Sequence, residues 1–214
     1  MRLAHTIVLA TLNLDKFDEF KELFAAYPTL VLEPAAKQVR NSEGLKFVEK
    51  HDSYLENAVA KARLCNHASH YPALADDSGI EVEALGGKPG VHSHRYASPK
   101  AGMSQDQANT ELLLKEIQAA GKSVEGTPAR FVATLALVVE GILLHATGIL
   151  EGTLTNRPRG TQGFGYDPIF IPKGSDKTFA EMTSPEKNKI SHRAKALKNL
   201  MNQIEANGIV LAKP

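Results

Sequence analysis

The stretch from residue 131 to residue 150 is the most apolar part of the sequence, and it constrains the fold more than any other feature. Two runs rich in aliphatic and β-branched residues, FVATLALVV (131–139) and ILLHATGIL (142–150), flank the pair Glu140-Gly141. Two such runs joined by a two-residue connection are typical of a β-hairpin. A membrane helix needs about 20 consecutive apolar residues, so the polar break argues against one. We therefore predict a β-hairpin over this stretch.

Strand and helix patterns alternate along the rest of the chain, which is typical of an α/β fold. The run TIVLAT (6–11) predicts a buried strand, and the helical spacing of apolar residues from Phe17 to Phe24 predicts a helix directly after it. Because no repeat or linker is evident, we predict a single domain over residues 1–214. The same patterns predict helices from Tyr54 onward and over 105–119, a strand over 71–75 that stops at Asp76, irregular chain over 28–52, and a loop over 151–165.

Composition excludes several classes of protein. The chain carries 25 Lys+Arg against 24 Asp+Glu, and this near balance argues against a dedicated nucleic-acid binder. The one cysteine, Cys65, cannot form an internal disulfide and favours a reducing compartment. The apolar N-terminal stretch is short and meets Asp15-Lys16 without a cleavage pattern, so we expect no secretory signal. We expect a globular cytoplasmic protein that does not span a membrane.

Two adjacent carboxylates follow the predicted strand over 71–75, in the sequence Asp76-Asp77-Ser78-Gly79. Neighbouring carboxylates are costly unless positive charge lies nearby. One interpretation is a solvated turn. The other is a site for a divalent metal, since Mg²⁺ prefers hard oxygen ligands and commonly takes one or two protein carboxylates together with phosphate oxygens. Side chains alternate along a strand, so the two carboxylates need not bind the same ion.

Two further segments carry candidate binding groups. Thr183 and Glu186 form a capping-box pattern, and a break before Ser191 places two cationic side chains, His192 and Arg193, in the first turn of the last helix. The helix dipole disfavours cations at that end, so the placement indicates a bound anion that offsets it; the alternative is a charged surface. In Gly163–Pro168 the two aromatic rings would either stack on a planar base or pack in a hairpin turn.

The helix after the first strand offers backbone N–H groups that favour an anion near residues 13–16. Taken together with it, four stretches resemble the non-canonical purine nucleoside triphosphate pyrophosphatases, the inosine triphosphatase-like enzymes. In the family's order they are LENAVAKA (55–62), LADDSGIEVEALGGKPGVHSHRYA (74–97), GFGYDPIF (163–170) and FAEMTSPEKNKISHRAKAL (179–197).

The resemblance implies hydrolysis of ITP, dITP and XTP to the nucleoside monophosphate and pyrophosphate. It also implies a Mg²⁺ requirement and, usually, a homodimer. The fold that it implies is an elongated α/β domain with a long mixed central sheet flanked by helices, and an active-site cleft between two lobes in which Lys16, Lys61 and Lys187 converge.

The resemblance further implies roles for individual residues. Asp77 matches the carboxylate that acts as general base and metal ligand, and Glu49 matches a second metal carboxylate. The residues expected to contact the substrate are Thr11, Leu12, Asn13, Leu14, Asp15 and Lys16 in the phosphate loop, Lys61 facing the phosphates, Ser78 beside Asp77, the nucleoside segment Phe164, Gly165, Tyr166 and Asp167, and finally Lys187, His192 and Arg193.

The sequence departs from the family pattern in two places. Leu12 stands where the family usually has glycine or asparagine, and Asp15 adds an anion to the phosphate loop. Asp52 competes with Glu49 for the role of second metal carboxylate. Two other functions remain open from the residues: a Mg²⁺-dependent nuclease, disfavoured by the near-neutral charge, and a nucleotide sensor that binds ITP without releasing pyrophosphate.

Overall fold

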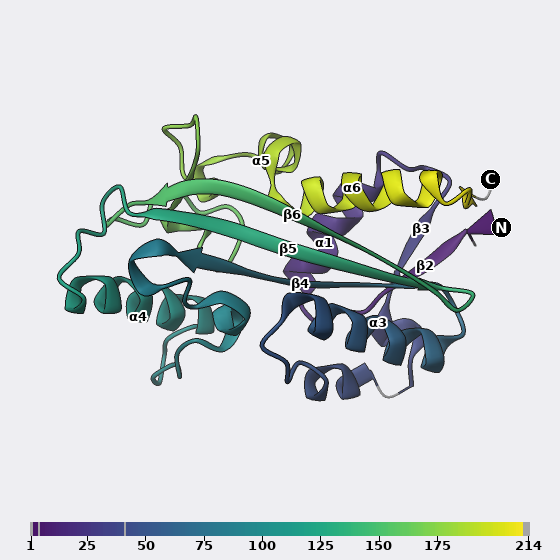
Figure 1. Ribbon diagram of the computed structural model, residues 1–214. Helices are drawn as coiled ribbons and strands as arrows, with labels where there is room; N and C mark the ends of the chain where they lie inside the picture. The colour runs from purple at the N-terminus through teal and green to yellow at the C-terminus, as the bar shows by residue number, and fades with distance from the viewer. Residues whose placement is uncertain (1, 4, 41, 212–214) are drawn as a thin grey trace. The chain divides into compact units, whose positions relative to one another are not determined.

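The computed structural model of the protein describes residues 2–3, 5–40 and 42–211. Within these residues the largest sheet has six strands in the order β3-β2-β4-β5-β6-β7, and a second sheet pairs β1 with β8 (Figure 1). β2 pairs in parallel with β3 and β4, whereas β6 and β7 are antiparallel, which confirms the predicted α/β fold with a mixed sheet. The strands are β1 (Arg2–Leu3), β2 (Thr6–Leu9), β3 (Val31–Pro34), β4 (Ala73–Val82), β5 (Pro128–Val139), β6 (Ile142–Leu154), β7 (Phe170–Pro172) and β8 (Val210–Leu211).

The helices of the described residues vary widely in length. They are α1 (Leu14–Phe24), α2 (Ala35–Gln38), α3 (Tyr54–Ser69), α4 (Gln105–Ala119), α5 (Ser184–Ile190) and α6 (His192–Ala206), with 3₁₀ turns η1 (Ser42–Phe47), η2 (Glu83–Leu85), η3 (Gly90–Arg95), η4 (Asp167–Ile169) and η5 (Phe179–Glu181). None of the helices in this part of the chain combines the length and the apolar character needed to cross a lipid bilayer.

The chain divides into two compact units. The first holds the described residues within Met1–Asp77, Ala133–Gly148 and Arg193–Pro214, and the second holds Ser78–Val132 and Ile149–His192. β4, β5 and β6 each contribute residues to both units. The assignment of residues 1–214 to one domain stays a prediction.

In the first unit, alternate residues of β2, together with Ala10 directly after it, pack into two different apolar clusters. Ile7 and Leu9 lie with residues of α1 and α6, and Val8 and Ala10 lie with residues of α3. This period of two is the pattern of a strand buried on both faces. Figure 1 shows α6 and α3 on opposite sides of the sheet, in agreement with the two clusters.

The register between β2 and β4 places the loop after β2 beside Asp76. Leu9 pairs with Leu74 in parallel, and Thr11 and Asp76 each follow that pair by two residues. In open α/β sheets, ligands bind beyond the carboxyl ends of the strands. The first unit therefore gathers the end of β2 and the carboxylates of β4 at such an edge.

In the second unit, the core forms around aromatic rings and the apolar face of α4. Phe131 contacts the ring of Phe170 edge-on at 4.6 Å between centroids, and it stacks on Phe179 at 5.8 Å. Leu113 and Ile117 of α4 belong to the same cluster, one helical turn apart.

Three expectations about element boundaries are wrong. β4 does not stop at Asp76 but continues to Val82, because buried cationic and polar partners compensate the carboxylates inside the strand. Residues 28–52 contain β3, α2 and η1; β3 is an edge strand whose residues are exposed or half-buried, so it lacks an apolar signature. The loop after the hairpin begins later than residue 151, since Gly152–Leu154 of β6 pair with β7.

Other local predictions are confirmed. α4 spans residues 105–119 as predicted, and α5 ends one residue before Ser191, so the predicted break is present. Glu140 and Gly141 have φ values of 47° and 82°, both in the left-handed region that a two-residue hairpin turn requires.

Candidate functional site

The turn between β2 and α1 holds the predicted phosphate loop. Asn13 is the N-cap of α1, and its Oδ1 accepts the N–H of Lys16 at 3.0 Å. Thr11 Oγ1 accepts the N–H of Asn13 at 3.2 Å. Leu12 packs against the apolar cluster beneath α3, whereas Leu14 and Asp15 are exposed. The side chain of Leu12 thus packs against the core. The cap fixes the backbone position of Lys16 in the first turn of α1.

Asp76 is a fully buried carboxylate of the first unit. Its Oδ2 lies 2.7 Å from Lys16 Nζ and 3.6 Å from Arg193 Nε. Burial acts to raise the pKa of this carboxyl, but Lys16 and Arg193 outweigh burial and hold the pKa well below its usual range. Asp76 is therefore a charged group that joins the phosphate loop to the start of α6.

Asp77, the next residue along β4, has a different set of partners. Asn57 Nδ2 donates to Asp77 Oδ2 at 3.0 Å, and Lys61 Nζ lies 3.6 Å from Asp77 Oδ1. Burial raises the pKa of Asp77 above its ordinary value, although Lys61 and Lys16 act in the opposite direction. The predicted alternation of the two aspartates is confirmed, since each has its own hydrogen-bond and closest ion-pair partner.

Lys61 reaches both carboxylates that the sequence assigned to a metal. Its Nζ lies 2.6 Å from Glu49 Oε1 as well as 3.6 Å from Asp77 Oδ1, and it donates to the carbonyl of Asp76 at 2.6 Å. Burial alone would lower the pKa of Lys61, but Asp77 and Glu49 raise it, so the ammonium stays charged.

Asn57 holds the segment that carries Glu49. Its Oδ1 accepts the N–H of His51, and its Nδ2 donates to the carbonyl of His51, each at 3.0 Å. The same Nδ2 also donates to Asp77. One buried amide thus ties the segment between Glu49 and Asp52 to β4. The contact of Glu49 with Lys61, which also faces Asp77, favours Glu49 over Asp52 as the carboxylate that accompanies Asp77.

The donor chemistry of this pair fits a hard divalent cation. Glu49 and Asp77 both present carboxylate oxygens to the single ammonium of Lys61, and Glu49 remains 29% exposed. Among the described residues no set of three or more His, Cys, Asp or Glu side chains is arranged as a complete metal centre. Mg²⁺ commonly binds through one or two carboxylates and takes its other ligands from water and phosphate, so two carboxylates suffice.

The second unit holds the predicted nucleoside segment. Asp167 Oδ2 accepts the N–H of Phe164 at 3.1 Å and an N–H from Lys187 Nζ at 2.7 Å. A Cβ on Gly163 would lie 2.0 Å from that same oxygen, so glycine is required there. Lys187 Nζ also lies over the ring of Phe164, 5.1 Å from its centroid. Phe164 is half-buried and is held by its backbone and by a neighbouring cation.

The remaining predicted residues have distinct environments. Tyr166 is buried in the aromatic core and donates its hydroxyl to the carbonyl of Ser93 at 2.9 Å. His192 stacks on Phe131 with 4.7 Å between ring centroids. Ser78 lies half-buried in β4 directly after Asp77. Tyr166 and His192 are therefore buried, packed groups, whereas Phe164 is half-buried.

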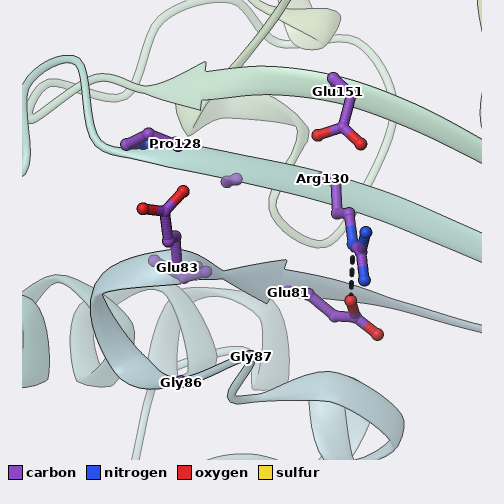
Figure 2. Close-up of a pocket in the computed structure, with 9 residues that line it drawn as sticks. Glu81, Glu83, Gly86, Gly87, Pro128, Arg130 and Glu151 are labelled. Carbon is purple, nitrogen blue, oxygen red and sulfur yellow. Dashed lines mark hydrogen bonds and ion pairs between the residues drawn. The ribbon is translucent and has the colours of Figure 1, made fainter.

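A pocket on the sheet surface of the second unit lies apart from these residues. Glu81, Glu83, Arg130 and Glu151 are among the residues that line its volume of about 330 Å³ (Figure 2). Arg130 Nε donates to Glu81 Oε2 at 2.7 Å across β4 and β5. None of the predicted site residues lines it.

A family comparison matches residues 7–203 with the Ham1 family. The chain belongs to the Ham1 family. It is 43% identical over 204 residues to a dITP/XTP pyrophosphatase of Bacillus subtilis, covering 93% of this chain and 96% of that protein. It is 42% identical over 207 residues to a dITP/XTP pyrophosphatase of Bordetella pertussis, covering 95% and 93%. These matches confirm the family resemblance that the four motifs indicated.

Solved structures of Ham1 proteins share the fold. A HAM1 protein from Coxiella burnetii superposes with a TM-score of 0.77 at 35% identity, covering 95% of this chain and all of the other. The Ham1 protein of Staphylococcus aureus gives a TM-score of 0.74 at 32% identity, with coverage of 94% and 99%.

Within this Ham1 chain, the predicted residues separate between the units. Lys16, Lys61, Glu49, Asp77 and Arg193 belong to the first unit, where they are linked through Asp76 or through each other. Lys187 belongs to the second unit, where it is paired with Asp167. The convergence of Lys187 with Lys16 and Lys61 stays a prediction.

Sequence reasoning missed three polar residues in or beside the candidate site. Asn57 was quoted only as part of a motif, and Glu19 and Asp106 were not singled out. Glu19 carried one available signal, since a carboxylate directly before Phe20 on the apolar side of a helix requires a buried cation. The contact of Asp106 with Gly165 joins residues 59 positions apart and left no local pattern.

Proposed function

We propose that this chain hydrolyses the non-canonical purine nucleoside triphosphates ITP, dITP and XTP to the nucleoside monophosphate and pyrophosphate. The observation that carries the proposal is the carboxylate pair Glu49 and Asp77 facing Lys61, in a Ham1 chain 43% identical to a protein named dITP/XTP pyrophosphatase. A buried, charged lysine between two carboxylates suits a polyanionic substrate and a hard cation.

We assign binding of the triphosphate to the first-unit cluster of Lys16, Lys61, Glu49 and Asp77. Asp77 orients a water molecule and accepts its proton, so that the water oxygen bonds to the α-phosphorus and the bond from that phosphorus to the bridging oxygen breaks. Lys16 and Lys61 donate hydrogen bonds to phosphate oxygens, and pyrophosphate leaves with the bridging oxygen. Mg²⁺ held by Asp77 and Glu49 would neutralise negative charge on the phosphates.

In the second unit, we assign the binding of the base to Phe164, which is half-buried. Tyr166 packs in the core, which leaves Phe164 as the aromatic surface for stacking. A 6-oxo purine is selected by a donor aimed at O6, because adenine places an amino group there and would leave the donor unpaired. The N–H groups of Phe164 and Gly165 are used by Asp167 and Asp106, so His192, which belongs to the same unit, is the proposed donor.

The proposal includes a homodimer in the cytoplasm. A single cysteine suits a reducing compartment, and the nucleotide pool that such an enzyme would cleanse lies there. The activity as proposed involves no nucleic acid.

The deciding experiment measures pyrophosphate release with Mg²⁺ from ITP, dITP and XTP against ATP and GTP, with a chelator as the metal control. We expect rapid release from the first three alone and none with chelator. Equal release from all five nucleotides would retain the bond cleavage and remove the base selection. Tight ITP binding without release would overturn hydrolysis and indicate a sensor, and degradation of oligonucleotides would indicate a nuclease.

A further inference from the structure

The first turn of α4 contacts two loops that are distant in sequence, all within the second unit. Asp106 Oδ2 accepts the N–H of Gly165 at 2.7 Å. Asn109, three residues later on the helix, accepts the N–H of Ala97 at 2.8 Å and donates to the carbonyl of His94 at 3.0 Å. A single helical turn thus fixes both the loop at 94–97 and the loop at 163–167.

The two loops are also joined through Ser93, which directly precedes His94. The hydroxyl of Tyr166 donates to the carbonyl of Ser93, and Ser93 Oγ in turn accepts the N–H of Ile80 at 2.9 Å. Burial, together with Tyr96 and Asp106, raises the pKa of Tyr166, so its hydroxyl remains a donor. The hydrogen bonds of Asp106, Tyr166 and Asn109 therefore link α4, the loop at 94–97 and the nucleoside segment to one another.

Two consecutive backbone hydrogen bonds hold the chain at Phe164. Its own N–H donates to Asp167, and the next N–H, of Gly165, donates to Asp106. Gly163 and Gly165, on either side, have φ values of 71° and 63°, so the backbone turns sharply at both. Asp167, within the turn, and Asp106, on α4, each supply a carboxylate that accepts one backbone N–H of the turn.

We propose that Asp106 is a positioning residue that fixes the ring of Phe164 for base binding. The inference rests on the proposed function, which assigns the base to Phe164. A carboxylate in the first turn of a helix is stabilised by the helix dipole, and its hydrogen bond to a backbone N–H is charge-assisted. Holding the loop in its binding conformation lowers the ordering cost when the base binds, so the effect falls on binding rather than on phosphorus chemistry.

The experiment compares Asp106→Ala and Asp106→Asn with the wild type. Glu111→Ala is the matched control, because Glu111 is an exposed acid on the same helix paired with Lys115. The measurements are KM and kcat for ITP, together with calorimetric affinities for IMP and for inorganic pyrophosphate. IMP carries the base and pyrophosphate does not, so the pair separates the two ends of the substrate.

We expect Asp106→Ala to raise KM for ITP about tenfold, to weaken IMP binding by a similar factor and to leave kcat and pyrophosphate binding within about twofold. Asp106→Asn keeps an acceptor oxygen and is expected to recover most of the loss. Glu111→Ala is expected to match the wild type.

Four outcomes would overturn the inference. A lower apparent kcat with unchanged KM indicates loss of folded protein only, and equal weakening of IMP and pyrophosphate indicates a general effect on the site. Unchanged KM and IMP affinity in Asp106→Ala removes any role. If the wild type itself releases no pyrophosphate, the proposed function fails, and IMP affinity alone then decides: a loss in Asp106→Ala supports the inference, whereas equal or absent binding in both proteins overturns it.

Discussion

Arg193 Nη1 lies 3.0 Å from Glu19 Oε2, and both side chains are almost fully buried although 174 residues separate them in sequence. Arg193 Nε also lies 3.6 Å from Asp76 Oδ2. The position of Arg193 in the first turn of α6 led us to expect an anion that offsets the helix dipole. Two carboxylates of the chain itself lie beside Arg193 and account for its placement, and the bound anion that the sequence indicated stays a prediction.

Glu19→Gln is expected to lower the free energy of unfolding by about 3 kcal/mol, because it removes one carboxylate from a buried arginine. Glu22→Gln is the matched control, at an exposed position on the same helix, and is expected to change stability by less than about 0.5 kcal/mol. Denaturant unfolding at neutral pH measures both. Equal losses in the two variants would show that the ion pair adds nothing to stability.

The single cysteine is expected to be inert in the folded protein. Cys65 is fully buried on α3, and burial raises the pKa of its thiol to about 11, against a smaller lowering effect of Ser69. The thiolate is the reactive form, so a thiol reagent at mildly alkaline pH should label Cys65 only after denaturant is added. Rapid labelling of the native protein would mean that α3 opens locally.

Local sequence signals predicted those parts of the fold whose cause is local. The boundaries of α4, the capping box at Thr183 and Glu186, the break at Ser191 and the turn at Glu140-Gly141 all depend on interactions within a few residues. These interactions have strong sequence signatures, such as caps and two-residue turns.

The polar part of the candidate site could be predicted only as a set of residue types. Asp76 and Asp77 read as the end of a strand, because the side chains that compensate them come from remote segments, Lys16 and Arg193 for Asp76 and Lys61 for Asp77. No local pattern reports such partners, so the continuation of β4 could not be predicted, whereas the alternation of the two aspartates could.

The capping box of α5 makes stability depend on pH. Hydrogen bonds from the backbone and side chain of Thr183, and then Lys177, lower the pKa of Glu186 from its ordinary 4.5 to about 2. A carboxyl whose pKa falls on folding stabilises the protein above its unfolded pKa, and that stabilisation is lost as the pH drops through the folded value. The wild type should therefore exceed Glu186→Gln in Tm at neutral pH, and the difference should shrink between about pH 4.5 and pH 2. A difference that is constant with pH would assign the effect to packing.

Substitution of the two adjacent aspartates is expected to have different effects on stability. Asp76→Asn takes a full negative charge from a buried site shared by Lys16 and Arg193, so it should lower the free energy of unfolding by about 3 kcal/mol. Asp77→Asn keeps an oxygen that can accept from Asn57, so it should cost much less stability. Denaturant unfolding of the two variants makes this comparison.

The loss of activity per folded molecule should be greater for Asp77→Asn than for Asp76→Asn. Asn at position 77 cannot accept a proton from water, so pyrophosphate release by Asp77→Asn should fall by about 10²–10⁴-fold while ITP binding is largely retained. Asp76→Asn serves as the comparison. Its pyrophosphate release should fall in proportion to the loss of folded protein, and should recover in part when an osmolyte stabilises the fold. Unchanged kcat in Asp77→Asn would remove Asp77 from the proposed mechanism, because no structural loss masks the chemistry at that position.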